Sequence, residues 1–258
     1  MPGRVALLPV KLLHNLPDTC FRNLLLSFMQ ISIIIPVYNE AENIGRLVDY
    51  LMQHKAESVT QIIIVDAGST DNTIEVAKNA GATAVISPQK GRAAQMNYGT
   101  TVAKADILYF VHADTLPPVS FANDIATAVE KGFALGRYRT KFNSRKWYLK
   151  INAWFTRFDW FICMGGDQTL FITKDLYNES GGFKTDMFIM EEFEFVPRAR
   201  KNARYKIFNK PALVSARKYD NNSWWQVQIA NKKIVSMYKK GASQNEMVKK
   251  YSEMIRYR

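Results

Sequence analysis

The run Ser32-Ile33-Ile34-Ile35-Pro36-Val37, followed by Tyr38-Asn39-Glu40, decides the fold of this chain. Its first six residues are almost continuously apolar and rich in isoleucine, which is typical of a strand buried on both faces of a sheet. The run then ends in polar residues. Because ligands of open parallel sheets bind beyond the carboxyl ends of the strands, this end of the run predicts one edge of a binding site.

Further segments of the same kind follow, separated by stretches with helical periodicity. Strands are predicted at Gln61 to Val65, Ala82 to Ile86 and Ile107 to Val111. Helices are predicted at Ala41 to His54, from the turn at residues 66–71 to beyond Val76, and near Arg92 to Ala103. This alternation predicts an α/β fold with a Rossmann-like, mostly parallel central sheet flanked by helices. The spacing of Asn39 and Glu42 predicts a capping box at the start of the first helix.

The second half of the chain has a looser pattern. Aromatic and basic residues interleave from Phe142 to Phe161 and predict an amphipathic helix, and Thr169 to Thr173 predicts another strand. Gly181 and Gly182 predict a turn, and an acidic cluster follows at Glu191 to Glu194. The end of the chain has the pattern of a basic helical tail.

Composition narrows the class of protein. The chain has 258 residues, 47% apolar and 22% charged, which suits one globular domain with a substantial core. No apolar stretch approaches the roughly 18 residues that a membrane-spanning helix needs, so we expect no integral membrane protein. No export signal is evident, and Cys20 and Cys163 lack metal-ligand spacing. Reduced thiols and a cytoplasmic location are therefore expected.

The two ends of the chain differ from its middle. Residues 1–28 show no sustained periodicity and end directly before Met29, so we expect an extension outside the core fold, with Met29 as the natural start. A docked helical arm is the alternative. The core domain is expected at 29–230, and the basic tail at 231–258.

The positive charge is concentrated near the C-terminus. From Arg198 onward there are 16 Lys and Arg against 3 Asp and Glu, whereas residues 1–197 carry 19 against 20. Such a segment can face nucleic acid, anionic lipid or a phosphate-bearing substrate, and a solvated surface is an equally good interpretation. No nucleic-acid-binding module is recognisable, so we expect no nucleic acid. We expect a peripheral contact with the inner face of a membrane through this tail.

Polar residues that end the predicted strands are candidates for nucleotide binding. The ring of Tyr38 can stack on a nucleobase, and the carboxylate of Asp66 can accept hydrogen bonds from a base N–H or a ribose hydroxyl. Gly68 lets the backbone approach a ligand closely. The same residue types also occur in ordinary turns, caps and cores, so each alone is a weak signal.

The fourth predicted strand ends at His112-Ala113-Asp114-Thr115. The carboxylate of Asp114 can hold Mg²⁺ or Mn²⁺ against a diphosphate. His112 is either a second metal ligand, which would suit Mn²⁺ better than Mg²⁺, or a structural residue. Upstream, Lys90-Gly91-Arg92 opens a helix, where cations and free backbone N–H groups together attract anions.

Taken in order, these motifs resemble glycosyltransferase family 2, whose members have the GT-A fold. The resemblance runs from about Ile31 to beyond Trp225 and includes Ile34 to Glu40, Val65 to Thr73, Lys90 to Arg92 with Asn97 and Gly99, Phe110 to Thr115, Gly166 to Gln168, Gly181 to Phe183 and Met190 to Glu192. The His-Ala-Asp-Thr and Gly-Asp-Gln variants look most like the bacterial subgroup called radical-SAM/selenodomain-associated transferases.

The resemblance implies a metal-dependent, inverting transfer of a sugar from a UDP- or GDP-sugar to an unknown acceptor. The basic C-terminal segment suggests that this acceptor is lipid-linked or acidic. It implies that the donor site is lined by Pro36, Tyr38, Glu40, Asp66, Lys90, Arg92 and Asp114, and that Asp167 and Gln168 lie on the acceptor side.

The resemblance also implies roles for the carboxylates. Asp114 would be the metal-binding carboxylate of the Asp-x-Asp motif, with His112 where the first Asp usually stands. Glu192 stands where the family usually has its catalytic Asp and would be the general base, with Glu191 beside it. Pro197 falls within the helix that should follow, which leaves the start of that helix open.

Other classes fit the sequence less well. A nucleotide-sugar pyrophosphorylase needs a Gly-rich, Arg-containing loop after the first strand, and a dinucleotide-binding dehydrogenase needs Gly-x-Gly-x-x-Gly there. This chain has Tyr38-Asn39-Glu40-Ala41 instead. The open alternative is a non-catalytic descendant that binds nucleotide sugars or anionic surfaces, which the departures at His112 and Glu192 would suit.

Overall fold

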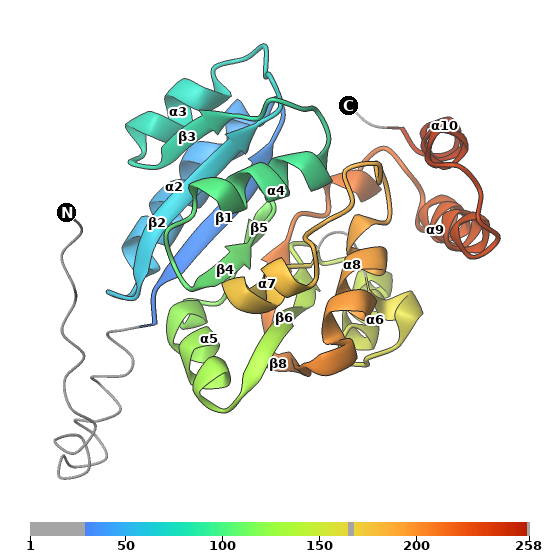
Figure 1. Cartoon of the computed structure of the whole chain (residues 1–258). Helices are drawn as coiled ribbons and strands as arrows, with labels where there is room; N and C mark the ends of the chain where they lie inside the picture. The colour runs from blue at the N-terminus through green and yellow to red at the C-terminus, as the bar shows by residue number, and fades with distance from the viewer. Residues whose placement is uncertain (1–28, 165–167, 257–258) are drawn as a thin grey trace, which may run out of the picture.

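The computed structural model describes residues 29–164 and 168–256 (Figure 1). Their strands form one eight-stranded sheet in the order β3-β2-β1-β4-β7-β6-β8-β5. The strands are β1 (Ile31–Val37), β2 (Val59–Asp66), β3 (Thr83–Ile86), β4 (Ile107–Phe110), β5 (Thr115–Leu116), β6 (Phe133–Phe142), β7 (Leu170–Thr173) and β8 (Arg204–Val214). The extension predicted at 1–28 lies outside the described residues.

The sheet is mixed, with one dominant direction. Strand β1 pairs in parallel with β2 and β4, β2 pairs in parallel with β3, and β6 pairs in parallel with β8. Only β7 and β5 run antiparallel to the neighbours they pair with among the described residues. The carboxyl ends of the remaining strands therefore share one edge of the sheet, as the α/β prediction required.

Helices cover both faces of the sheet. They are α2 (Ala41–His54), α3 (Thr73–Asn79), α4 (Arg92–Val102), α5 (Phe121–Glu130), α6 (Trp147–Phe155), α7 (Lys174–Glu179), α8 (Glu191–Ala199), α9 (Trp224–Lys239) and α10 (Gln244–Met254). In β1, Ile33 packs with Ile44 of α2, whereas the next residue, Ile34, packs with Met96 of α4. Burial on both faces explains why the strand is almost continuously apolar.

The predicted helix from Phe142 to Phe161 is wrong at both ends. Phe142 is the last residue of β6, and the helix occupies only Trp147–Phe155. After it, the guanidinium of Arg137 in β6 donates hydrogen bonds to the carbonyls of Thr156 (2.7 Å) and Phe158 (3.1 Å). The side chain of a residue in β6 thus binds carbonyls that further turns of the helix would otherwise use, and the helix ends before them.

The predicted capping box of Asn39 and Glu42 is also wrong. Glu40 is the N-cap of α2 and makes no side-chain cap hydrogen bond. The Asn39 side chain instead accepts a hydrogen bond from the Thr70 backbone N–H at 2.8 Å, and the Thr73 hydroxyl accepts one from the Glu40 N–H at 2.9 Å. The turn after β1 is therefore bonded to the turn after β2, which holds the two strand ends together.

The C-terminal helices pack on the core domain. Helix α9 runs across residue 230, where the sequence placed the start of the tail. Ile234 and Met247 are buried in the same cluster as Phe195 of α8, and Figure 1 shows α9 and α10 together at one end of the molecule. Among the described residues, no helix is both long and apolar enough to span a membrane.

Candidate active site

The carboxyl ends of β1 and β2 form the first part of the site. Val37 and Asp66 are partners in the parallel ladder, and Pro36 is buried one position earlier. Asp66 is fully buried, and its Oδ2 accepts hydrogen bonds from the backbone N–H groups of Gly68 and Ser69, both at 2.8 Å. Its carboxylate therefore shapes the turn. The Tyr38 side chain, directly after the end of β1, is 53% exposed.

A buried glutamine holds these two strand ends in place. The Gln95 side chain of α4 donates hydrogen bonds to the carbonyls of Val37 (2.8 Å) and Val65 (2.6 Å). Helix α4 can lie this close to the sheet because Gly99 has no side chain: a Cβ there would be 2.5 Å from Cγ2 of Ile34. Gln95 is thus a positioning residue for Tyr38 and Asp66.

Asn97, on the same helix, fixes the Gly181-Gly182 turn. Its side-chain N–H donates to the Phe183 carbonyl at 2.7 Å, and its Oδ1 accepts from the Phe183 N–H at 3.0 Å and from the Tyr177 hydroxyl. Burial raises the pKa of Tyr177 to about 12. Gly182 has a φ of 64° in this turn, a conformation that favours glycine.

A cation from the C-terminal half joins two predicted site carboxylates. The Arg217 guanidinium donates hydrogen bonds to both oxygens of Glu40, one of them at 2.9 Å. Its Nε lies 3.5 Å from Oδ2 of Asp114. The Ser215 N–H also donates to the Asp114 carbonyl at 3.0 Å, so the end of β8 is fastened to the turn after β4.

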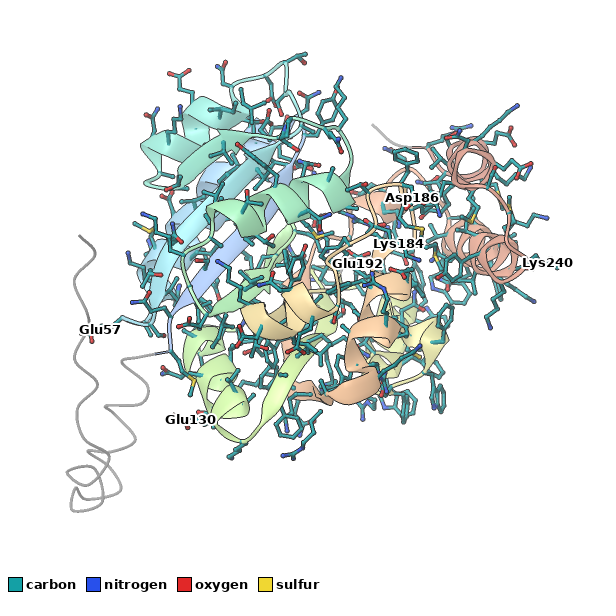
Figure 2. The ribbon with its side chains drawn as sticks, viewed as in Figure 1. Glu57, Glu130, Lys184, Asp186, Glu192 and Lys240 are labelled. Atoms are coloured by element: carbon teal, nitrogen blue, oxygen red, sulfur yellow. The ribbon has the colours of Figure 1, made fainter. Side chains whose placement is uncertain are left out.

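A second network surrounds the predicted general base. His112 directs its Nε2 to Oε1 of Glu192 at 3.8 Å, and Arg92 places a guanidinium nitrogen 3.6 Å from the other oxygen of Glu192. Arg92 also forms an ion pair with Glu191, which is only 1% exposed. Figure 2 shows Glu192 in the middle of the molecule. The acidic first turn of α8 and the start of α4 therefore meet here.

The remaining predicted residues lie at the margins. Lys90 is exposed directly before α4, whose N-cap Gly91 has a φ of 114°. The Gln168 side chain donates to the Cys163 carbonyl at 2.9 Å and lines a small cavity together with Glu192. Asp167 lies outside the described residues.

The residues at the strand ends fit a metal that is shared with substrate. Within the part of the chain that the structure describes, no three His, Cys, Asp or Glu side chains are grouped closely enough to hold a metal by themselves. Asp114 and Glu40 nevertheless converge on one guanidinium, so two oxygen donors already face a single cation. Mg²⁺ is commonly held by one or two carboxylates plus substrate phosphates.

The arrangement separates two kinds of chemistry. Asp114 faces the network of Arg217 and Glu40, where a cation can be balanced against phosphate. His112, on the same short segment, faces Glu192, where a carboxylate can take a proton. The sequence motifs included Asp114, Glu40, His112 and Glu192, but they did not include Arg217 or Gln95. Neither of those two stands in a recognisable motif, because only the folded chain brings them to the site.

Comparison with known proteins identifies the family. Residues 32–188, more than half of the chain, match Glycosyl transferase family 2. The chain is 30% identical over 96 residues to glucosyl-3-phosphoglycerate synthase of Mycolicibacterium smegmatis. The aligned region covers 34% of this chain and 32% of that protein. The chain thus spans about a third of the length of this relative.

Solved structures share the fold. Glucosyl-3-phosphoglycerate synthase from Mycobacterium tuberculosis, in complex with Mn²⁺, UDP and glucosyl-3-phosphoglycerate, superposes with a TM-score of 0.60 at 15% identity, over 93% of this chain and 86% of that one. Mannosyltransferase PcManGT from Pyrobaculum calidifontis, in complex with GDP-Man and Mn²⁺, gives 0.60 at 16% identity, over 87% and 69%. These likenesses confirm the GT-A type of α/β fold. The family match shows that the chain belongs to glycosyltransferase family 2.

Proposed function

We propose that this chain transfers a sugar from a UDP- or GDP-sugar to an acceptor hydroxyl, with Mg²⁺ or Mn²⁺ and with inversion at the anomeric carbon. The observation that carries the proposal is the meeting of two networks at the carboxyl edge of the sheet. One joins Asp114, Glu40 and Arg217, and the other joins His112, Arg92 and Glu192.

The donor is assigned to the edge formed by β1, β2 and β4. Tyr38 stacks on the base, Asp66 and Glu40 bind the nucleoside, and buried Pro36 supports the strand end. Lys90 and Arg92 attract the diphosphate. Asp114 holds the metal, and His112 is the candidate for its second protein ligand. UDP and GDP-Man with Mn²⁺ in the two related structures support this choice of donors and metal. The metal supplies charge neutralisation for the departing diphosphate.

Glu192 is assigned as the general base. Its carboxylate takes the proton of the acceptor hydroxyl as that oxygen bonds to the anomeric carbon. The bond from that carbon to the diphosphate oxygen breaks, and its electron pair leaves with the nucleoside diphosphate. A single displacement of this kind inverts the configuration. Glu191 holds Arg92 beside the base, since its buried carboxylate forms an ion pair with that guanidinium.

The acceptor is proposed to be lipid-linked or acidic, with Asp167 and Gln168 on its side of the site. Access would come through a peripheral contact with the inner face of a membrane, to which the basic C-terminal segment adds long-range attraction. The His-Ala-Asp-Thr and Gly-Asp-Gln variants support membership of the radical-SAM/selenodomain-associated subgroup.

A donor panel tests the proposed function. Purified protein is mixed with UDP- and GDP-sugars and Mn²⁺, and both thermal stabilisation and release of nucleoside diphosphate are measured. One donor should raise the melting temperature and be hydrolysed slowly without acceptor. Stabilisation without hydrolysis of any donor would favour the non-catalytic descendant, and neither effect would contradict the proposal.

A further inference from the structure

Helix α6 turns an apolar stripe outward. Trp147, Ile151, Trp154 and Phe155 recur at the spacing of one helical face, and they are 69%, 44%, 47% and 41% exposed. Leu149, on another side of the helix, is 1% exposed. An apolar stripe with this spacing normally faces the core of a protein. Here it faces away from the core among the described residues.

The aromatic surface continues past the end of α6. Trp154 packs against Phe158 with ring centroids 4.9 Å apart, and Phe158 stacks on Trp160 at 4.6 Å. Trp160 is itself 53% exposed. A contiguous exposed apolar patch with aromatic side chains marks an interaction site more often than a solvated surface.

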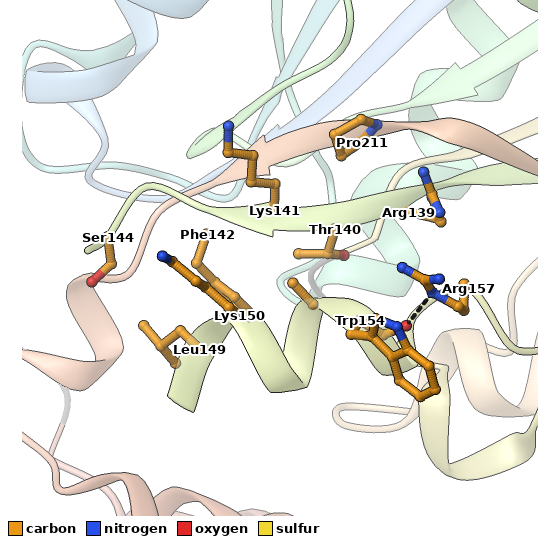
Figure 3. A pocket seen from close by; sticks show the side chains of 11 residues that line it. Arg139, Thr140, Lys141, Phe142, Ser144, Leu149, Lys150, Trp154, Arg157 and Pro211 are labelled. Atoms are coloured by element: carbon orange, nitrogen blue, oxygen red, sulfur yellow. Dashed lines mark hydrogen bonds between the residues drawn. The ribbon is translucent and has the colours of Figure 1, made fainter. Parts of the chain in front are cut away.

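A basic pocket adjoins this stripe (Figure 3). It is formed by the end of β6, α6 and Pro211 of β8, and its cationic lining residues are Arg139, Lys141, Lys150 and Arg157. No acidic side chain is among its lining residues. Arg157 donates to the Trp154 carbonyl at 2.9 Å and lies over the Trp154 ring at 4.7 Å. Cations and the aromatic stripe therefore belong to one continuous surface.

The charge around this surface is not cancelled locally. Asp159, the nearest acid in sequence, is held by two hydrogen bonds from Arg200 at 2.6 and 2.5 Å. Within the described residues, Lys141 and Lys150 form no ion pair. By contrast, two cations of the basic C-terminal segment are paired with acids of the same chain: Lys210 pairs with Asp124, and Arg217 pairs with Glu40.

We infer that α6, the segment to Trp160 and the basic pocket form a docking surface for an anionic phospholipid bilayer. A lipid phosphate occupies the pocket, and the indole rings lie in the headgroup layer. Amphipathic helices with aromatic residues beside Lys and Arg bind membranes in this way, and each basic residue near an anionic surface adds about 1 kcal/mol. Charge complementarity selects a bilayer over an apolar protein partner.

The docking surface lies beside the candidate active site. Phe142, which lines the pocket, is the ladder partner of Val214, and the next residue, Ser215, bonds the Asp114 backbone. A bilayer bound here would bring lipid-linked molecules close to the edge that holds Asp114. The inference concerns binding alone and does not require that the chain transfers a sugar.

Vesicle co-sedimentation tests the inference with the full chain. The vesicles contain phosphatidylcholine alone, or phosphatidylcholine with phosphatidylglycerol as the minor component. Lys141→Gln with Lys150→Gln should lower partitioning to the anionic vesicles by about 30-fold, about fivefold for each cation. Trp147→Ser with Ile151→Ser leaves the charge unchanged and should lower it by about tenfold. All four side chains are exposed, so melting temperatures should stay close to that of the wild type.

Two control variants remove the same charge elsewhere. Lys55→Gln with Lys78→Gln, near α2 and α3 at the other end of the sheet, should change partitioning by less than about twofold. Lys232→Gln with Lys233→Gln, on α9, should lower partitioning to the anionic vesicles by a smaller factor than Lys141→Gln with Lys150→Gln. Binding to anionic vesicles by Lys141→Gln with Lys150→Gln that is no weaker than the binding of either control variant would overturn the inference. So would equal binding to both kinds of vesicle, or glycerol phosphate that occupies the pocket while vesicles stay unbound.

Discussion

The Nε atom of Arg217 lies 3.5 Å from Oδ2 of Asp114, and the same guanidinium hydrogen-bonds the carboxylate of Glu40. A cation three residues beyond the end of β8 thus balances two acids at the carboxyl edge of the sheet. A divalent cation bound at Asp114 would compete with this guanidinium, because both are attracted to the same carboxylate.

Replacement of Arg217 should therefore increase the response to metal. Arg217→Ala should itself cost about 1 kcal/mol or less, because this ion pair is partly exposed. The two carboxylates it leaves should then bind Mn²⁺ more tightly, so Mn²⁺ should raise the melting temperature of the variant more than that of the wild type. Arg200→Ala, which breaks the pair with Asp159 instead, is the matched control. Equal responses in all three proteins would argue against a metal at Asp114.

Glu192→Gln should remove the base and keep its shape. Once an acceptor is known, kcat should fall by about 10²–10⁴ while donor binding stays nearly intact. The anomeric configuration of the product, measured by NMR, should be inverted relative to the donor. Transfer at the native rate by Glu192→Gln, or a retained configuration, would show that the mechanism is wrong.

Glu191→Gln should act mainly on stability. Glu191 is buried and forms the closer of two ion pairs of Arg92, so the variant removes this pair and leaves the longer contact of Arg92 with Glu192, at 3.6 Å. Its midpoint of urea unfolding should fall, and kcat should fall less than in Glu192→Gln. A loss of kcat as large as that of Glu192→Gln, with unchanged stability, would reassign the base to Glu191.

Gln95→Met should loosen the nucleotide edge. Methionine has nearly the volume of glutamine, but it cannot donate the two hydrogen bonds that Gln95 gives to the carbonyls of Val37 and Val65. The free energy of unfolding should drop by about 1–3 kcal/mol, and nucleotide affinity should drop with it. Gln53→Met, on the exposed side of α2, is the control and should change neither. Unchanged stability in Gln95→Met would mean that these hydrogen bonds do not hold the strand ends.

The first half of the fold could be predicted because its elements follow local periodicity. The range of α2 matches its prediction, and β1 and β4 agree to within one residue, since strands buried on both faces give unbroken apolar runs. Strands β6 and β8 were missed because charged residues interrupt them. Lys206 and Lys210 lie on β8, and Arg137 and Arg139 on β6.

The site divides in the same way. Asp66, Asp114 and Glu192 could be named because each stands in a short motif: Asp66 ends a strand, Asp114 follows one and Glu192 lies in the first turn of a helix. Arg217 and Gln95 could not, because their roles depend on hydrogen bonds to residues far away in the sequence. The exposed stripe of α6 has the spacing of a buried helical face, so its spacing alone does not reveal that it faces outward.

Glu194 should make stability depend on pH. Burial alone would raise its pKa, but hydrogen bonds from Arg198 and Lys184 outweigh burial and lower the pKa below the ordinary value of 4.5. A carboxyl group with a lowered pKa stabilises the folded state above that value, and this contribution is lost as the pH falls below it. The stability difference between wild type and Glu194→Gln should therefore be largest at neutral pH and shrink in acid. A difference that does not change with pH would contradict this account of Glu194.

Calorimetric titration of UDP and GDP, with and without Mn²⁺, tests the central claim most directly. The wild type should bind one of the two nucleotides with an affinity that Mn²⁺ increases, because Asp114 and the diphosphate would share the metal. Asp114→Ala should abolish the increase and leave any metal-independent binding in place. Binding of the nucleotide that does not depend on Mn²⁺ and is unchanged in Asp114→Ala would contradict the account.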